Sequence, residues 1–328
     1  MNNINSYLPY VFVINMDKDV ERMRIISNSL NKLGLKYSRV SAVNGKELEK
    51  NDKITSTCMK YCSNGMKGCA MSHMNLWKYI IDTNIEHALI LEDDAEFVDD
   101  FNNKFINFYN IVPKDYDILQ LGCVFGCNLR EDTNAIAYLF EKIISKSPEP
   151  KNGYNLLKYL TATHGYIISN KGATKLYNNF TIYTHIDLQI SIYMDNSDFI
   201  VYSPTKDLIV QKALNFLSNL TDKFPNLLLK QLDKINLFEN DHKYVSLGWL
   251  LSQTCFKIGW FDINGILILF ILLSVLSRYN MYFKIFILIW LIIEIIYAKG
   301  NGFQFLILFL AITEFDTIKN FTYSKIKF

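Results

Sequence analysis

Three consecutive carboxylates follow a short apolar run near residue 90. Residues 88–91 have the composition of a buried strand, and Glu92, Asp93 and Asp94 come directly after it. Adjacent carboxylates repel one another and need a cation or surrounding donors to stay ionised together. Oxygen ligands favour Mg²⁺ or Mn²⁺, and such ions commonly bridge carboxylates to phosphate oxygens. The triplet predicts a divalent-metal site, although an acidic turn at the start of a helix explains the same residues without a metal.

Polar groups that could surround a ligand occur in several other blocks. Asn15 ends the first apolar run, and Arg22 follows in the next segment, where its guanidinium could meet a phosphate or simply be solvated. His73 follows Ser72 on the apolar face of a predicted helix, beside Trp77, which favours a packed core histidine over a phosphate contact. Later blocks add the run Thr163, His164, Gly165 and Tyr166, and then the single acid Asp187.

Asp187 has two interpretations. An alcohol hydroxyl has a pKa far above neutrality, so a carboxylate within hydrogen-bond reach can accelerate its reaction by taking the proton. A single aspartate at this position is equally compatible with a helix N-cap.

Cysteines near His73 raise the alternative of zinc. Cys58, Cys62 and Cys69 follow a C-x3-C-x6-C pattern, which is not the spacing of a closed structural zinc site. We therefore expect ordinary buried or loop thiols at these positions.

The segments that must position these residues alternate between strand-like and helix-like patterns. Strands are predicted at 10–14, 36–42, 88–91, 118–122, 162–169 and 198–202. Helices are predicted at 20–33, capped by Asp19 and ended by Gly34, at 68–81, and at 170–177, capped by Asn170. Residues 44–64 read as a loop, and residues 128–159 as an insertion covering a cleft. This order predicts an α/β sheet with parallel members, which binds ligands beyond the carboxyl ends of its strands.

The composition changes after about residue 245. We therefore expect a catalytic domain at 1–245 and a hydrophobic helical tail at 246–328. Residues 261–277 and 281–298 are almost wholly apolar and are joined by a short turn containing Arg278. They predict a membrane hairpin near the lower length limit for spanning, with insertion to interfacial depth or a soluble helical subdomain as alternatives.

The overall charge and the N-terminus limit partners and compartment. The chain has 34 basic and 32 acidic side chains, a balance that does not indicate nucleic-acid binding. The first residues, MNNINSYLPY, lack the features of a secretory signal peptide. Six dispersed cysteines do not suggest a disulfide scaffold. We expect a membrane-associated protein with a reduced, cytosolic catalytic domain.

The order of these blocks resembles glycosyltransferase family 25, which includes bacterial lipooligosaccharide galactosyltransferases and procollagen galactosyltransferases. The matching blocks are VINMDKDVER, RVSAVNG, GCAMSHMNLW, LILEDDAEF, ILQLG, THGYIIS followed by KGATKLY, and HIDLQI. They span about residues 10 to 190 and leave the tail unmatched. The resemblance implies a GT-A-like fold with a Rossmann-like mixed sheet, a UDP-sugar donor (often UDP-galactose) and Mn²⁺ or Mg²⁺. A leucine of the family pattern is Met16 here.

The resemblance also implies roles for individual residues. It implies nucleotide-side contacts at Asn15, Arg22, Ser72, Glu92 and Asp93, and metal ligands at Glu92 and Asp94. It implies acceptor-side contacts at Thr163, His164, Gly165 and Tyr166, and it makes Asp187 the candidate general base. The implied reaction moves a hexose from a nucleotide sugar to a glycan, lipid or protein hydroxyl, with inversion. The alternatives are a catalytically silent, membrane-tethered binding protein of the same family and an unrelated multi-pass membrane protein with a soluble head.

Overall fold

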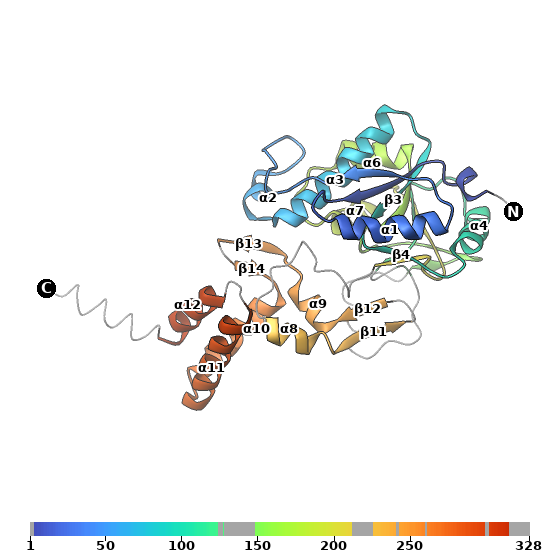
Figure 1. Cartoon of the computed structure of the whole chain (residues 1–328). Coiled ribbons are helices and arrows are strands. Elements are labelled where there is room, and N and C mark those ends of the chain that lie inside the picture. Colours follow the sequence, from blue (N-terminus) through green and yellow to red (C-terminus); the bar gives the residue numbers. More distant parts are fainter. Residues whose placement is uncertain are drawn as a thin grey trace. The chain divides into compact units, whose positions relative to one another are not determined.

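The structure, a computed structural model, divides the chain into two compact units. It describes residues 3–123, 127, 148–211, 226–240, 243–259, 261–298 and 302–314. The first unit comprises residues 1–218 and 237–245, and the second comprises 219–236 and 246–328 (Figure 1). The domain boundary expected near residue 245 stays a prediction; of the described residues before it, 226–236 are grouped with the second unit.

An eight-stranded sheet forms the centre of the first unit. In spatial order its strands are β2 (Ser38–Ser41), β1 (Val11–Asn15), β3 (His87–Glu92), β8 (Gly165–Ser169), β5 (Ile118–Gln120), β9 (Val201–Pro204), β7 (Tyr154–Leu156) and β6 (Glu149–Pro150). β1 runs parallel to β2 and β3, whereas β8 runs antiparallel to both β3 and β5. The mixed sheet confirms the predicted α/β class. Because β3 and β5 both oppose β8, they point the same way.

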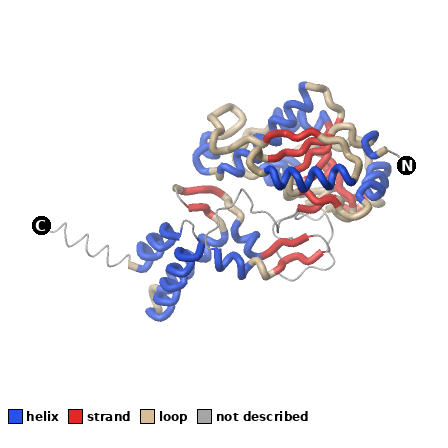
Figure 2. Tube along the Cα trace, in the orientation of Figure 1, coloured by secondary structure: helices blue, strands red, loops and turns tan. Residues whose placement is uncertain are grey.

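Helices cover both faces of this sheet (Figure 2). On β3, Leu89 and Leu91 pack in a cluster with residues of α1 (Val20–Lys32) and α4 (Phe101–Ile111). Ala88 and Ile90 pack on the other face, in a cluster with residues of α3 (Asn64–Asp82), α6 (Asn170–Asn179) and α7 (Ile186–Asp195). This burial on both faces explains why β3 reads as a continuous apolar run. The polar residues that end the strand are thereby held at the sheet edge.

Several local details differ from the predictions. The predicted loop at 44–64 contains α2 (Ser56–Tyr61), while β4 (Ala95–Phe97), α4 and β10 (Ile209–Gln211) were not predicted at all. Asp19 precedes α1 without a side-chain capping bond. Ser169, rather than Asn170, caps α6, because its hydroxyl accepts from the Gly172 amide at 3.0 Å. Residues 128–147 of the predicted insertion lie outside the described part of the chain.

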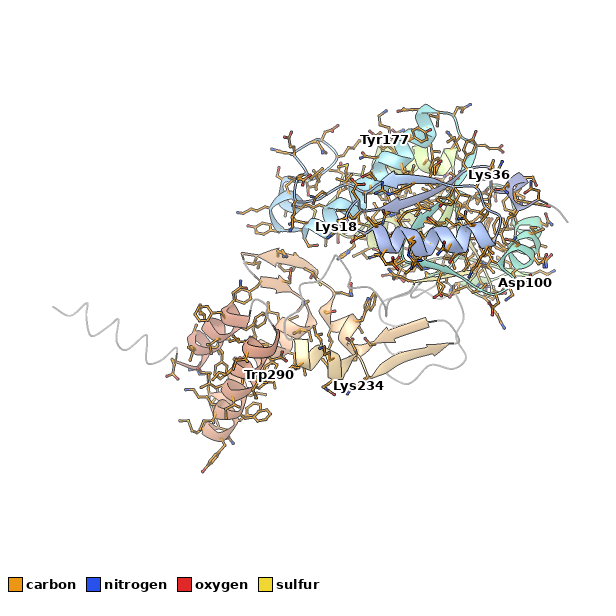
Figure 3. The ribbon with its side chains drawn as sticks, in the orientation of Figure 1. Lys18, Lys36, Asp100, Tyr177, Lys234 and Trp290 are labelled. Carbon is orange, nitrogen blue, oxygen red and sulfur yellow. A yellow bond between two sulfur atoms is a disulfide. The ribbon has the colours of Figure 1, made fainter. Side chains whose placement is uncertain are left out.

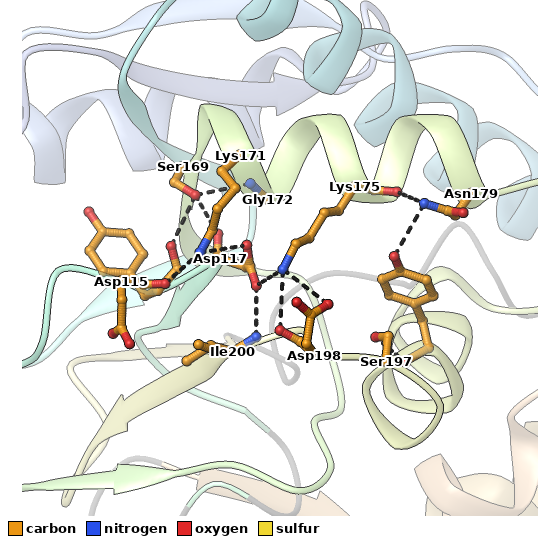
Figure 4. A network of polar contacts seen from close by, with 12 residues as sticks. Asp115, Asp117, Ser169, Lys171, Gly172, Lys175, Asn179, Ser197, Asp198 and Ile200 are labelled. Atoms are coloured by element: carbon orange, nitrogen blue, oxygen red, sulfur yellow. Dashed lines mark hydrogen bonds and ion pairs between the residues drawn. The ribbon is translucent and has the colours of Figure 1, made fainter.

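Asp117 fixes α6 against the edge of the sheet at the start of β5 (Figure 4). Its fully buried carboxylate accepts from Lys175 Nζ at 2.9 Å and from the Ile200 amide at 2.8 Å. Lys171 Nζ lies 3.3 Å from the other carboxylate oxygen. Two lysines and one amide thus balance a single buried charge, which joins α6 to the residues preceding β9.

Four of the six cysteines form disulfides, Cys58 with Cys62 and Cys123 with Cys127. The prediction of thiols at Cys58, Cys62 and Cys69 is therefore wrong for Cys58 and Cys62 and confirmed for Cys69. The bridged Cα atoms lie 4.6 and 6.0 Å apart, within the range that a disulfide needs. Each disulfide joins residues only four positions apart in the sequence, so both bridges link short local segments and neither joins distant parts of the chain. Cys69 and Cys255 are free.

The second unit is mainly helical. It contains α8 (Asn226–Leu232), α9 (Leu247–Ser252), the strand pair β13 (Phe256–Ile258) and β14 (Phe261–Ile263), and α10 (Gly265–Ser277), α11 (Met281–Ala298) and α12 (Gly302–Thr313). The further strand pair β11 (Asn236–Asn240) and β12 (Lys243–Ser246) lies mostly within the first unit's residues. α10, α11 and α12 share an apolar cluster that includes Phe270 and Leu291, with Trp290 packed against it (Figure 3).

A buried acid explains one departure from the apolar pattern of α11. Both carboxylate oxygens of Glu294, which is fully buried, accept amides at the start of α8, from Leu227 and Leu228 at 2.9 Å each. A carboxylate at a helix N-terminus is favourable because the free amides and the helix dipole both attract negative charge. Among the described residues, no helix combines the length and apolar character needed to cross a membrane. The spanning hairpin predicted at 261–298 is therefore not supported.

Candidate active site

The register between β1 and β3 brings the first polar block to the acidic triplet. Ile14 pairs with Glu92, so Asn15, the last residue of β1, lies beside Asp93, the first residue after β3. The buried Asn15 amide donates to Asp93 Oδ2 at 2.7 Å and to the Asp19 carbonyl at 3.0 Å, and its oxygen accepts from Arg39 Nε at 2.9 Å. Asn15 therefore fixes the acidic turn through protein contacts.

Arg22 supplies the positive charge nearest to the triplet. It stands in the first turn of α1, and its guanidinium forms ion pairs with Asp93 and with Asp94 Oδ2, the latter at 3.0 Å. Burial raises the pKa of Asp93, while Arg22 and Asn15 act in the opposite direction. Arg22 is therefore shared between Asp93 and Asp94, and the third acid, Glu92, directly precedes them in the sequence.

Asp94 has the least satisfied carboxylate of the triplet. Its Oδ2 accepts from Gln211 Nε2 at 3.2 Å in addition to Arg22, but its buried Oδ1 has no hydrogen-bond partner among the described residues. Burial, together with the charges of Glu92 and Asp93, raises the pKa of Asp94 to about 7 despite Arg22. An unpartnered buried carboxylate oxygen beside a second acid fits a hard divalent cation, which prefers oxygen ligands. The residues present are therefore suited to Mn²⁺ or Mg²⁺.

Glu92 points towards a different set of partners. Thr163 Oγ1 donates to Glu92 Oε1 at 2.7 Å, and His73 Nε2 lies 3.6 Å from the same oxygen. Burial opposes ionisation of Glu92, but the contacts with His73 and Thr163 outweigh it and lower the pKa. Glu92 is therefore the readily ionised acid of the triplet, whereas Asp94 is the acid that resists ionisation.

Asp187 holds the strained segment that precedes Thr163. Ala162 has φ +70°, a left-handed conformation unusual for a residue with a side chain. Its amide donates to Asp187 Oδ2 at 2.8 Å, and its carbonyl accepts from Gln120 Nε2 at 3.1 Å. Asp187 is half-buried and lies in the first turn of α7, after the N-cap His185, so the N-cap alternative is wrong. Strain of this kind clusters at functional sites.

Other residues assigned from the sequence are buried within the protein. The Ser72 hydroxyl donates to the Gly68 carbonyl at 2.7 Å and accepts from the Val43 amide at 2.8 Å. The Tyr166 hydroxyl accepts from Trp77 Nε1 at 2.9 Å and lies 2.9 Å from His73 Nδ1. These contacts occupy both side chains, so ligand contacts by Ser72 and Tyr166 remain predictions that the geometry does not favour.

His164 and Gly165 lie where β8 meets β10. The buried His164 ring places Nε2 3.3 Å from the Ile209 carbonyl. A Cβ added at Gly165 would lie 2.9 Å from the Ile209 side chain, so only glycine fits without displacement. Both residues have a clear packing role, and their predicted acceptor contacts stay predictions.

Two residues near the acids were not singled out as site residues from the sequence. Gln211 reaches Asp94 from β10, which pairs with β4 with Gln211 opposite Ala95. Nothing in the local pattern of residues 209–211 indicated this contact. Cys69 lies one helical turn before His73, and burial together with the charges of Glu92, Asp187 and Asp94 raises the pKa of its thiol. The zinc alternative raised by the sequence grouped Cys69 with Cys58, Cys62 and His73, and it did not include Glu92.

Comparison with known proteins agrees with this geometry. The model described as "Glycosyltransferase family 25 (LPS biosynthesis protein)" matches residues 9–194, which contain every block quoted above. The chain belongs to glycosyltransferase family 25. The resemblance predicted from the sequence is thereby confirmed.

Similar curated proteins include further members of the family. Procollagen galactosyltransferase 1-B of Xenopus laevis is 28% identical over 186 residues, which cover 51% of this chain and 28% of the relative. A glycosyltransferase 25 family member of Drosophila melanogaster is 26% identical over 185 residues, covering 52% and 28%. Procollagen galactosyltransferase 2 of Mus musculus is 27% identical over 184 residues, covering 51% and 27%. The match spans little more than a quarter of the length of these relatives.

A comparison with solved structures matched a glycosyltransferase involved in the glycosylation of the major capsid of PBCV-1. It is 9% identical, covers 63% of this chain and 93% of its own, and aligns with a TM-score of 0.35.

Proposed function

We propose that this family 25 chain is a divalent-metal-dependent hexosyltransferase that uses UDP-galactose as donor. The transfer goes to a hydroxyl of a glycan, lipid or protein acceptor, with inversion at the sugar. The observation that carries the proposal is the buried Asp94 Oδ1, which has no hydrogen-bond partner among the residues that the structure describes. It lies at the carboxyl ends of the strands, beside Glu92 and Arg22. The names of the procollagen galactosyltransferases among the relatives support the choice of galactose.

The residues at the sheet edge divide the binding work. Asp94, with Glu92, would hold the Mn²⁺ or Mg²⁺ ion, which when bound supplies Lewis-acid stabilisation of the leaving diphosphate. Arg22 lies against Asp93 and Asp94, so its guanidinium also stands where a diphosphate would enter. Asn15 donates to Asp93 and so holds in place the carboxylate with which Arg22 pairs.

The acceptor side is built around the strained segment at Ala162. Asp187 is our candidate base, because it is half-buried and a carboxylate can take the proton of an acceptor hydroxyl. Its two oxygens accept from the Ala162 and Leu188 amides, and each keeps a further lone pair for that proton. The same carboxylate holds the Ala162 amide, and the next residue, Thr163, donates to Glu92. Proton removal at Asp187 and donor binding at Glu92 are therefore linked through two adjacent residues.

A donor screen tests the proposal. Nucleotide release is measured with UDP- and GDP-sugars in Mn²⁺, with excess EDTA and the Asp94→Asn variant as controls. We expect release from UDP-galactose that both controls suppress. Nucleotide release that is the same in excess EDTA as in Mn²⁺ would refute the metal assignment. No release with any donor or acceptor would favour the catalytically silent alternative.

A further inference from the structure

A second group of potential metal ligands shares Glu92 with the acidic triplet. Within the part of the chain that the structure describes, one set of three His, Cys, Asp or Glu side chains brings its ligand atoms within 4.8 Å of one another, and it consists of Cys69, His73 and Glu92. Cys69 and His73 are four residues apart on α3, so both project from the same helix face. Glu92 meets them from the end of β3.

The surroundings of His73 leave one ring nitrogen without a proper partner. The ring is fully buried, and Nδ1 lies 2.9 Å from the Tyr166 hydroxyl, which also accepts from Trp77 Nε1. Within the described part of the chain, Nε2 has no hydrogen-bond partner, and it lies 3.6 Å from Glu92 Oε1. When Nδ1 donates to Tyr166, the Nε2 lone pair faces a carboxylate oxygen, an arrangement that a cation between the two atoms stabilises.

This arrangement matches the environment of a metal-bound histidine. Such a histidine coordinates through one nitrogen and donates the other N–H to a protein acceptor that fixes the ring. Tyr166 can fill that role here because its oxygen has two lone pairs, one for Trp77 and one for His73. The buried ring thus places Nε2 3.6 Å from Glu92 Oε1, and the ligand atoms of Cys69, His73 and Glu92 lie within 4.8 Å of one another.

The donor set selects a different metal from the one proposed at Asp94. Sulfur and imidazole ligands suit Zn²⁺, whereas Mg²⁺ and Mn²⁺ prefer oxygen. We propose that Cys69, His73 and Glu92 form a binding site for Zn²⁺ or a similarly thiophilic divalent ion. The Cys69 thiol gives up its proton to solvent as the sulfur binds. Three protein ligands leave the fourth tetrahedral position to water or an incoming ligand.

Glu92 belongs to both the zinc group and the proposed donor-metal pair. If the proposed function holds, zinc and the donor metal compete for Glu92, and zinc lowers transfer. Zinc binding itself depends only on the three side chains, so it can be measured without turnover.

Cobalt titration of the purified full-length chain tests the site. Co²⁺ bound by a cysteine gives a thiolate-to-metal charge-transfer band, and Zn²⁺ should abolish it by displacement. We expect this band to saturate at one equivalent of Co²⁺ per chain in the wild type and to be absent in Cys69→Ser. Cys255→Ser, at the other free cysteine, is the matched control and should keep the band, as should the double variant Cys58→Ser/Cys62→Ser.

Two further measurements decide the location without relying on the folding of Cys69→Ser. X-ray absorption on the zinc-loaded wild type should find a single sulfur ligand, and two or more sulfurs would overturn the proposal. Asp94→Asn should keep the cobalt band, so loss of the band there would assign the ion to the acidic triplet instead. A wild type with no thiolate band but with Mn²⁺-dependent nucleotide release would refute the zinc site and leave the proposed function standing.

Discussion

Buried carboxylates lie at opposite strand ends of the central sheet, one before β5 and three at the end of β3, and they differ in how their negative charge is balanced. Asp117, at the start of β5, has two lysines and a backbone amide for its one charge (Figure 4). The triplet at the end of β3 has three carboxylates, with Arg22 shared between two of them. Among the described residues, Oδ1 lacks a hydrogen-bond partner in both Asp117 and Asp94, but Lys171 Nζ lies 3.3 Å from Oδ1 of Asp117. The two sites therefore differ in how their charges are balanced. A buried acid that the protein itself balances holds the fold together. We propose that the buried acids left short of positive charge bind a ligand.

The largest effect that the comparison predicts is on Asp94. Asp94→Asn should lower transfer by about 1,000-fold, or about 4 kcal/mol, because the variant loses a charge that would hold the metal. Kinetics at saturating donor measure this change.

The fold should survive the same substitution. The pKa of Asp94 is about 7 in the folded chain and 3.8 in the reference state, so the folded chain binds the proton more tightly. The stability of the metal-free wild type therefore falls as the pH rises through that window. Asp94→Asn lacks this loss, so its melting temperature at pH 8 should be no lower than that of the wild type. A large drop would mean that Asp94 is structural like Asp117.

The second effect concerns Asp187. Asp187→Asn should lower turnover at saturating donor by about 100-fold, as expected for the loss of a general base. The amide oxygen of asparagine can still accept from the Ala162 amide, so the strained segment should keep its conformation. Donor affinity, measured by calorimetry, should change little. A collapse of donor affinity with normal turnover would instead make Asp187 a donor contact.

Asp117 should give the reverse pattern. Asp117→Ala should lower the free energy of unfolding by about 1–3 kcal/mol, because the Ile200 amide loses its acceptor and two lysines lose their partner. The lysine side chains are partly exposed and can regain water, which keeps the loss below that of a fully buried pair. Urea denaturation measures it. Activity per folded molecule should stay at the wild-type level, and a specific loss of activity would remove the contrast between the two edges.

The smallest effect is the pH dependence of metal binding. Because a metal binds the ionised carboxylate and the pKa of Asp94 is about 7, Mn²⁺ affinity should be constant above that pH. Below it, the dissociation constant should rise by up to about tenfold per pH unit. Titrations at a series of pH values measure this, with Asp94→Asn as the control. An affinity that is flat down to pH 5 would contradict the assignment of Asp94 as a ligand.

The sequence predicted the strands that carry the site better than the contacts within it. β1, β3 and β8 are buried on both faces, so their apolar runs were plain, and the triplet after β3 was visible for the same reason. The pairing of Gln211 with Asp94 depends on strand pairing between residues 117 positions apart, which no local pattern encodes. Buried hydroxyls at Ser72 and Tyr166 look the same in sequence whether they face a ligand or a backbone carbonyl.

The cysteines illustrate the same limit. Cys58, Cys62 and Cys69 formed one group by spacing, but the fold pairs the first two and turns the third towards His73 and Glu92. The tail differs in another way. Its apolar composition was evident, but the role of Glu294 depends on the distant start of α8, which the sequence of α11 does not contain.

Calorimetric titration of UDP into the metal-free chain, with and without Mn²⁺, tests the central claim most directly. The wild type should bind UDP at least about tenfold more tightly when Mn²⁺ is present, a gain of about 1.4 kcal/mol, and Asp94→Asn should show no such gain. Asp117→Ala, measured as folded protein, should behave like the wild type. UDP affinity that is the same with Mn²⁺ and in excess EDTA would contradict the account, because the unbalanced acids would then have no role in holding the donor.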